Sequence, residues 1–156
     1  MKSENLSEEE IIKKLESFCA YRERCEAEIK QKMYALHVSP SDYETYLQYL
    51  KENNFFNEER FANAFARGKS TIKKWGRKKI VLELQAKNID AQKISQSLLQ
   101  IDEGLYVLKL EDILIKKIKT IKETDVFKKK QKLIQFALQK GYEYEIINEV
   151  LKEINL

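Results

Sequence analysis

Glycine and proline are scarce in this chain of 156 residues, which contains four Gly and one Pro. A β-rich fold with many tight turns needs more of both residues, so the composition favours long helices. No segment approaches 18 consecutive apolar residues, and we therefore expect no membrane span. Residues 1–5 lack the apolar stretch of a signal peptide, so a cytoplasmic location is the default expectation.

Residues that perform chemistry are equally few. His37 is the single histidine, and Cys19 and Cys25 are the only cysteines. One His and two Cys cannot build a His-rich or Cys-rich zinc site. The chain has no Ser-His-Asp set, and the segment between Gly68 and Gly76 does not have the sequence of a phosphate-binding loop. We therefore expect no enzyme, no catalytic residue, no cofactor and no metal site.

Charge is abundant and unevenly distributed along the chain. Charged residues make up 35% of the sequence, and the net charge is +4. Residues 57–140 hold 20 Lys and Arg against 10 Asp and Glu, whereas residues 1–56 hold 8 against 11 and residues 141–156 hold 1 against 4. A localised positive excess is the pattern expected of a protein that meets a polyanion. A solvated lysine-rich surface explains the same charge, and the sequence does not decide between the two.

An internal repeat is the most informative pattern in the sequence. Six apolar positions recur with offsets of 51 and then 53 residues, and their spacing predicts a helix, a short turn and a second helix. An amphipathic stretch precedes each pair, near 7–21, at 57–67 and near 105–122. The equivalent positions are Ile29, Met33, Val38, Tyr43, Leu47 and Leu50; then Ile80, Leu84, Ile89, Ile94, Leu98 and Ile101; then Leu133, Ala137, Tyr142, Ile147, Leu151 and Ile154.

The predicted fold is therefore all-α, an elongated array of three tandem three-helix repeats. The predicted units are residues 1–56, 57–104 and 105–156, with some freedom at the joints near Phe56 and near 102–104. Such small units bury little core alone, so contacts between neighbours should contribute to stability. Ser7, Asn57 and Asp90 are predicted helix caps, and Ser39 is a fourth candidate before Pro40. Gly68 is expected to end its helix, and Gly141 to end another in a left-handed conformation.

Cations occupy the predicted first turn of the paired helix in two repeats. Glu26 and Glu28 suit that position in repeat one, but Arg77 and Lys79 stand there in repeat two, and Lys130 and Lys132 in repeat three. Cations at a helix N-terminus oppose the helix dipole, so a bound polyanion or an acidic partner would explain them. The candidate site is a basic edge formed by Lys69, Lys73, Lys74, Trp75, Arg77, Lys78, Lys79, Lys128, Lys129, Lys130 and Lys132.

The sequence allows three roles for the Trp75 ring. An aromatic ring among cations can stack on a nucleic-acid base or anchor a protein contact. It can also close the bottom of its own helix bundle, and the sequence leaves these alternatives open.

Three segments resemble one known family. Residues 56–62, Phe-Asn-Glu-Glu-Arg-Phe-Ala, with Trp-Gly-Arg-Lys-Lys-Ile at 75–80 and Lys-Asn-Ile at 87–89, resemble the central motif of the RecX regulatory proteins. Residues 21–29 resemble the first-repeat motif, with Cys25 where the family usually has Ser, and residues 139–142 resemble the third-repeat motif. The resemblance covers roughly residues 8–154, and this family is known for three tandem three-helix repeats.

The resemblance implies a modulator of the RecA recombinase that is not itself an enzyme. Such proteins bind RecA or its filament on single-stranded DNA and lower recombination, ATP hydrolysis and co-protease activity. The expected partners are RecA, its nucleoprotein filament and single- or double-stranded DNA, and the protein is expected to be a monomer. Two other readings of the residues stay open: a helical nucleic-acid-binding module that acts without a recombinase, and a structural helical adaptor.

Overall fold

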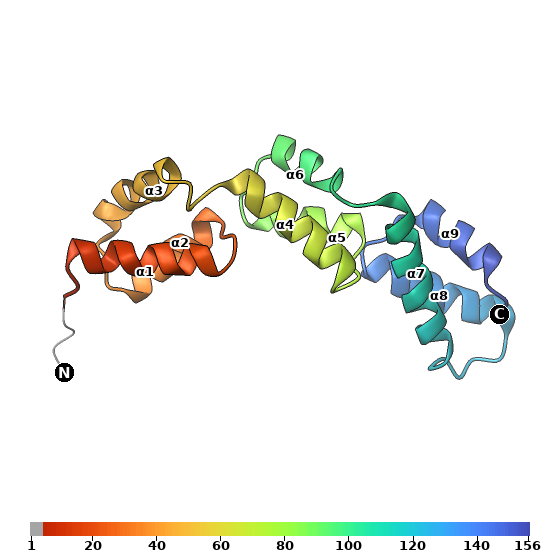
Figure 1. The fold of residues 1–156 in the computed structure, drawn as a ribbon. Coiled ribbons are helices and arrows are strands. Elements are labelled where there is room, and N and C mark those ends of the chain that lie inside the picture. Colours follow the sequence, from red (N-terminus) through yellow and green to blue (C-terminus); the bar gives the residue numbers. More distant parts are fainter. Residues whose placement is uncertain (1–4) are drawn as a thin grey trace.

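Helices form an extended arch in the computed structural model, which describes residues 5–156 (Figure 1). Within that range the chain forms nine α-helices, one short 3₁₀ helix and no strand. None of these helices is long and apolar enough to cross a membrane. The α-helices are α1 (Glu8–Tyr21), α2 (Glu26–Ala35), α3 (Tyr43–Glu52), α4 (Glu58–Thr71), α5 (Arg77–Ala86), α6 (Ala91–Leu98), α7 (Glu103–Ile118), α8 (Val126–Gln139) and α9 (Tyr144–Glu153).

The core consists of three hydrophobic clusters that follow one another along the arch. All eighteen positions of the apolar repeat are buried in one of these clusters or pack against it. Leu47 and Leu151 lie in the cluster of their own helix group, and Leu98 packs against the cluster of its group. The prediction of an all-α array of three tandem three-helix repeats is therefore confirmed.

The same backbone turn closes the second helix of each group. His37, Asn88 and Gly141 lie at equivalent positions and have φ angles of 61°, 61° and 97°. The residue after each one donates its backbone N–H to a carbonyl five residues earlier, as in Val38 to Met33. This left-handed helix ending tolerates Asn and favours Gly. The prediction for Gly141 is thus confirmed, and His37 also adopts this conformation.

Side-chain caps begin several helices as the sequence predicted. The side chains of Ser7, Asn57 and Asp90 each accept a hydrogen bond from a backbone N–H in the first turn of their helix. Ser39 does not cap a backbone N–H and instead contacts the Ser41 hydroxyl. Cys25 precedes α2 without a capping bond.

Three predicted helix bounds are wrong. Helix α4 continues through Gly68 to Thr71, because the Ile72 N–H still bonds to the Gly68 carbonyl and no left-handed residue follows until Lys74. Lys69 therefore lies on a helix and not in a connecting loop. Helix α7 spans Glu103–Ile118 after its cap Asp102, whereas the predicted stretch runs near 105–122. Helix α8 begins at Val126 after its cap Asp125, before the predicted first turn at Lys130 and Lys132.

The second and third helix groups are joined by direct backbone contact. Gly76 donates its N–H to the Lys140 carbonyl at 2.7 Å, and Lys78 donates to the Gly141 carbonyl at 2.9 Å. A Cβ atom on Gly76 would overlap the backbone of Gly141. We expected some freedom at the joint near 102–104. The bonds from Gly76 and Lys78 to residues 140 and 141 instead hold the second and third helix groups together.

The unit boundaries at 56/57 and 104/105 remain a proposal. Cys25, from the first unit, packs in the second hydrophobic cluster, and Ile101 packs against both the second and the third. The apolar contacts thus cross each proposed boundary. Residues 1–4 lie outside the described residues. The predicted first unit includes them, and so does the expectation that the chain has no signal peptide.

Candidate partner-binding surface

Trp75 lies between two lysines beside the second core cluster. The Lys69 and Lys79 ammonium nitrogens lie 5.0 Å and 4.5 Å from the indole centroid. Phe65 packs edge-on against the indole, with ring centroids 6.3 Å apart. Trp75 itself packs against the core of this helix group. These contacts support the interpretation that Trp75 closes its bundle, and they leave little open ring face for a base.

Arg77 is a partly buried residue at the joint, and its charge is paired within the fold. Its side chain is 21% exposed and forms ion pairs with Glu103 and with Glu143, the latter at 2.7 Å. The guanidinium carbon also lies 3.9 Å from the Tyr106 ring centroid. The Tyr106 hydroxyl donates to Glu143 and accepts the Arg77 backbone N–H. Burial and the bond to Glu143 raise the pKa of Tyr106, which keeps this hydroxyl a donor.

Lys74 also faces the third helix group. Its ammonium pairs with Asp112 of α7, and its backbone carbonyl accepts the Tyr142 hydroxyl at 2.9 Å. The hydrogen bond with Asp112 raises the pKa of Lys74 and lowers the pKa of Asp112. Lys74 and Arg77 are thus occupied in holding two helix groups together and are poorly placed to meet a partner.

The remaining predicted cations are available to solvent. Lys132 pairs weakly with Glu123, at 3.8 Å. The others have no ion-pair partner within residues 5–156: Lys69, Lys73, Lys78, Lys79, Lys128, Lys129 and Lys130.

The structure separates these lysines into two groups. The joint at Gly76 contacts the C-terminal end of α8, whereas Lys128 to Lys132 lie near its N-terminal end. At a rise of about 1.5 Å per residue, Lys130 lies roughly 15 Å along the helix axis from Lys140. The predicted equivalence of helix starts also fails, because α8 begins four residues before Lys130. Lys130 and Lys132 therefore lie beyond its first turn.

Three cations that the sequence analysis missed lie in the third helix group. Lys117 and Lys140 lie 4.9 Å and 5.7 Å from the Phe136 ring centroid. A shallow groove of about 430 Å³ is lined by Lys117, Lys122 and Phe136 together with Lys132. The sequence contains one indication of Lys140 as a surface cation, because the repeat offset of 53 residues aligns it with Lys87. Lys140 occupies the joint itself, between the two lysine groups.

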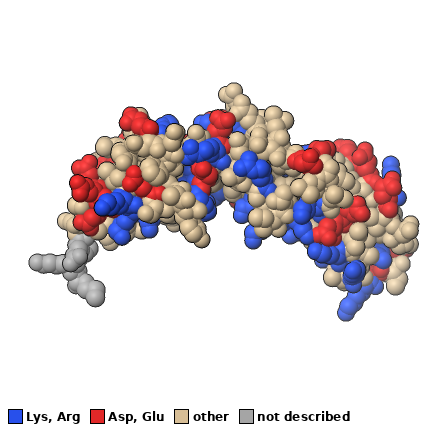
Figure 2. Space-filling model, viewed as in Figure 1, with Lys and Arg blue, Asp and Glu red and all other residues tan. Residues whose placement is uncertain are grey.

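In the space-filling view, basic atoms lie along the lower edge from the centre to the C-terminal end of the arch (Figure 2). Acidic atoms gather along the upper edge at that end. The arrangement gives one margin of the second and third helix groups a positive field, which attracts an acidic or anionic partner.

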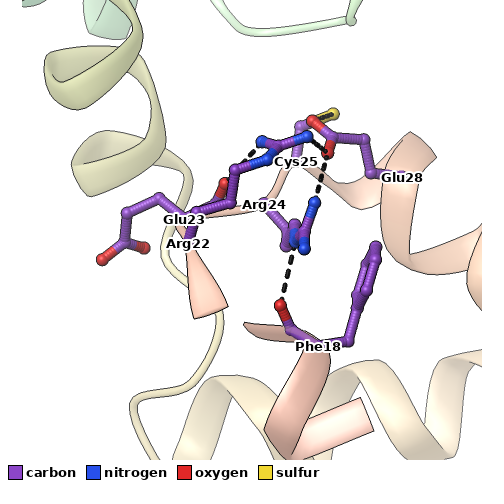
Figure 3. A network of polar contacts seen from close by, with 6 residues as sticks. All are labelled: Phe18, Arg22, Glu23, Arg24, Cys25 and Glu28. Carbon is purple, nitrogen blue, oxygen red and sulfur yellow. Dashed lines mark hydrogen bonds and ion pairs between the residues drawn. The ribbon is translucent and has the colours of Figure 1, made fainter. Parts of the chain in front are cut away.

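Glu28, in the acidic first turn of α2, forms its polar contacts within the first helix group (Figure 3). Glu28 accepts Arg22 at 2.6 Å, Arg24 at 3.5 Å and the Cys25 thiol at 3.4 Å. Arg24 also donates to the Phe18 carbonyl and covers the Phe18 ring. Glu28 therefore stabilises the start of α2 and the turn before it.

The fold and this surface define a class of protein: an elongated helical-repeat protein with a basic margin. Comparison with known families is consistent with that class. Residues 57–98 match the model described as RecX, second three-helix domain, and residues 109–151 match RecX, third three-helix domain. The two matches together span more than half of the chain, which therefore belongs to the RecX family.

Relatives and solved structures agree with this assignment. The "Regulatory protein RecX" of Clostridium beijerinckii is 29% identical over 84% of this chain and 62% of its own length. That of Clostridium botulinum, strain Eklund 17B, is 30% identical over 83% of this chain and 61% of its own. The chain thus spans about three-fifths of the length of these curated relatives. The crystal structure of RecX from Lactobacillus salivarius has the same fold, with a TM-score of 0.76, 23% identity and coverage of 92% of this chain and 96% of that one.

Proposed function

We propose that this chain binds the RecA recombinase, or its filament on single-stranded DNA, and lowers its recombination, ATPase and co-protease activities. In this proposal the protein acts in the cytoplasm as a monomer, without catalysing a reaction. The observation that carries the proposal is the pair of RecX matches over residues 57–98 and 109–151. The solvent-facing lysines lie within or beside the same two segments.

The unpaired lysines support contact with a polyanion or an acidic protein surface. We place the contact on Lys69, Lys73, Lys78 and Lys79 near the joint and on Lys128, Lys129 and Lys130 at the start of α8. Arg77, Lys74 and Trp75 support this surface from within the fold. Cations without acidic partners keep their full field for a ligand, whereas paired ones are largely neutralised.

RecA-dependent ATP hydrolysis on single-stranded DNA tests the proposal directly. RecA from the same source is assayed with increasing amounts of this protein, from substoichiometric to equimolar. We expect the rate of hydrolysis and of strand exchange to fall. An unchanged RecA rate, together with tight binding to single-stranded DNA alone, would instead favour a nucleic-acid-binding module that acts without a recombinase.

A further inference from the structure

A cavity lies between the first and second helix groups. It encloses about 720 Å³, and its walls come from α2 and the residues before it on one side and from α4 on the other. Lys87, at the end of α5, completes the rim. A cavity of this size falls within the range of ligand-binding sites.

The floor of the cavity is an apolar face of α4. Ala64, Phe65, Gly68 and Ile72 line it at helical spacing. Ile72 is 79% exposed, although it is a large aliphatic residue. A Cβ atom on Gly68 would meet no atom within 4 Å, so the backbone of α4 is open to the cavity there. A glycine inside a helix costs about 1 kcal/mol relative to alanine, and this one leaves room for a side chain from outside.

The rim of the cavity carries unbalanced positive charge. Its two carboxylates each have an arginine partner, Glu23 with Arg60 at 3.0 Å and Glu28 with Arg22 and Arg24. The second carboxylate oxygen of Glu23 is buried without a hydrogen-bond partner within the described residues. Lys69, Lys73 and Lys87 have no ion-pair partner within residues 5–156. The cavity therefore complements a ligand that combines negative charge with an apolar group.

The walls favour a protein over a nucleic acid. The ammonium groups of Lys69 and Lys87 lie 5.4 Å and 5.9 Å from the Phe65 ring centroid. They therefore occupy the aromatic ring on which a base would stack. Aspartate or glutamate beside an aliphatic side chain matches both the lysines and the apolar floor.

We propose that this cavity docks an acidic protein segment whose apolar side chain enters the space over Gly68. The inference rests on the proposed function, because it gives the recombinase-binding protein a protein-specific contact that adjoins its basic margin and shares Lys69 and Lys73 with it. The proposed occupant of the cavity is a protein segment of the partner. Nucleic acid and a second copy of this chain are the competing occupants.

The test uses Gly68→Leu, which fills the space, and Gly104→Leu as the matched control. Gly104 is a second helical glycine, exposed in the first turn of α7 and distant in sequence from the cavity. Leucine favours helix more than glycine does, so neither variant should melt below the wild type. Binding is measured to RecA without nucleic acid and, separately, to a fluorescent oligothymidylate.

Gly68→Leu should weaken RecA binding by about ten-fold or more, as expected when an anchor pocket is blocked. Its oligothymidylate binding should stay within about two-fold of wild type, and Gly104→Leu should match wild type with both probes. Lys87→Glu, on the cavity rim but outside the predicted basic edge, should also weaken RecA binding, whereas Lys119→Glu, on the exposed end of α7, should not.

Three results overturn the docking proposal: a Gly68→Leu variant that binds RecA normally, one that loses oligothymidylate binding instead, or wild-type self-association that Gly68→Leu abolishes in sedimentation. If wild type inhibits RecA ATPase and Gly68→Leu inhibits equally, only the docking proposal fails. If wild type neither binds nor inhibits RecA, the proposed function fails and the docking proposal fails with it.

Discussion

Arg77 and Lys78 are adjacent cations with different surroundings. The Arg77 side chain lies between Glu103 and Glu143 and over the Tyr106 ring. Lys78 is exposed and has no ion-pair partner within residues 5–156. A cation is available to a partner when the fold places no carboxylate beside it, so availability is decided residue by residue.

We predict that Arg77→Gln destabilises the protein and that Lys78→Gln does not. Losing hydrogen bonds to a charged, partly buried group costs roughly 1–3 kcal/mol, and Glu143 would be left facing Tyr106 without its cation. Thermal and urea unfolding of both variants measure the difference. Equal stability of the two variants would show that the Arg77 network contributes nothing to the joint.

Gly76 and Gly68 form a second contrast at this scale. A Cβ atom on Gly76 would overlap Gly141, whereas Gly68 faces open space. We predict that Gly76→Ala lowers the free energy of unfolding by roughly 2–4 kcal/mol, in the upper part of the range for point mutations. Gly68→Ala should raise it by up to about 1 kcal/mol, because alanine favours helix. Urea unfolding with a common m-value checks both signs, and a neutral Gly76→Ala would contradict the close backbone contact.

At the scale of the element, each helix begins and ends through short-range chemistry. Asp90 caps α6 by accepting the Lys93 backbone N–H at 2.9 Å. That bond, with the Lys93 side chain, lowers the pKa of Asp90 below its usual value. Because the folded-state pKa is depressed, the ionised cap stabilises the protein above the unfolded-state pKa near 3.9, and the contribution disappears as pH falls through the lower folded-state pKa.

Comparison with Asp90→Asn isolates this effect, since asparagine also caps but does not titrate. We predict that the melting temperature of wild type exceeds that of Asp90→Asn near pH 7. The difference should shrink as pH falls below about 4. Melting by circular dichroism at several pH values measures it, and a difference that stays constant down to pH 2 would argue against the ionised cap.

At the scale of the whole molecule, the second and third helix groups share a backbone-bonded joint and a basic margin. The joint holds the lysines near Gly76 in a defined position relative to α8. A partner that spans both lysine groups therefore meets a largely preformed surface, and little ordering is needed on binding.

We predict that Lys73→Glu combined with Lys78→Glu weakens filament binding strongly and leaves melting nearly unchanged, because exposed charges contribute little to folding. Lys13→Glu combined with Lys14→Glu makes the same change of charge on α1 and should have a smaller effect on binding. If the wild-type contacts are to phosphates of a single strand, the logarithm of affinity should fall with that of salt concentration, with a slope of about −0.7 per phosphate. Salt-insensitive binding, or a normal inhibitory effect of the first variant, would show that this margin is only a solvated surface.

The repeat, the helices and most of their caps can be predicted from the order of residues along the chain. These features depend on hydrophobic period and on bonds within a few residues, as the three equivalent turns at His37, Asn88 and Gly141 illustrate. The predicted helix end at Gly68 is wrong because glycine ends a helix of this kind only where the chain turns left-handed, and α4 continues to Thr71.

Which cations face solvent depends on contacts between residues far apart in the sequence. Glu143 is 66 residues from Arg77 and Asp112 is 38 residues from Lys74, yet each neutralises its partner across the joint. The cavity over Gly68 likewise needs walls from two helix groups. Charge pairing and cavities act through space at a few ångströms, so the linear order of residues reveals the charges without revealing their neighbours.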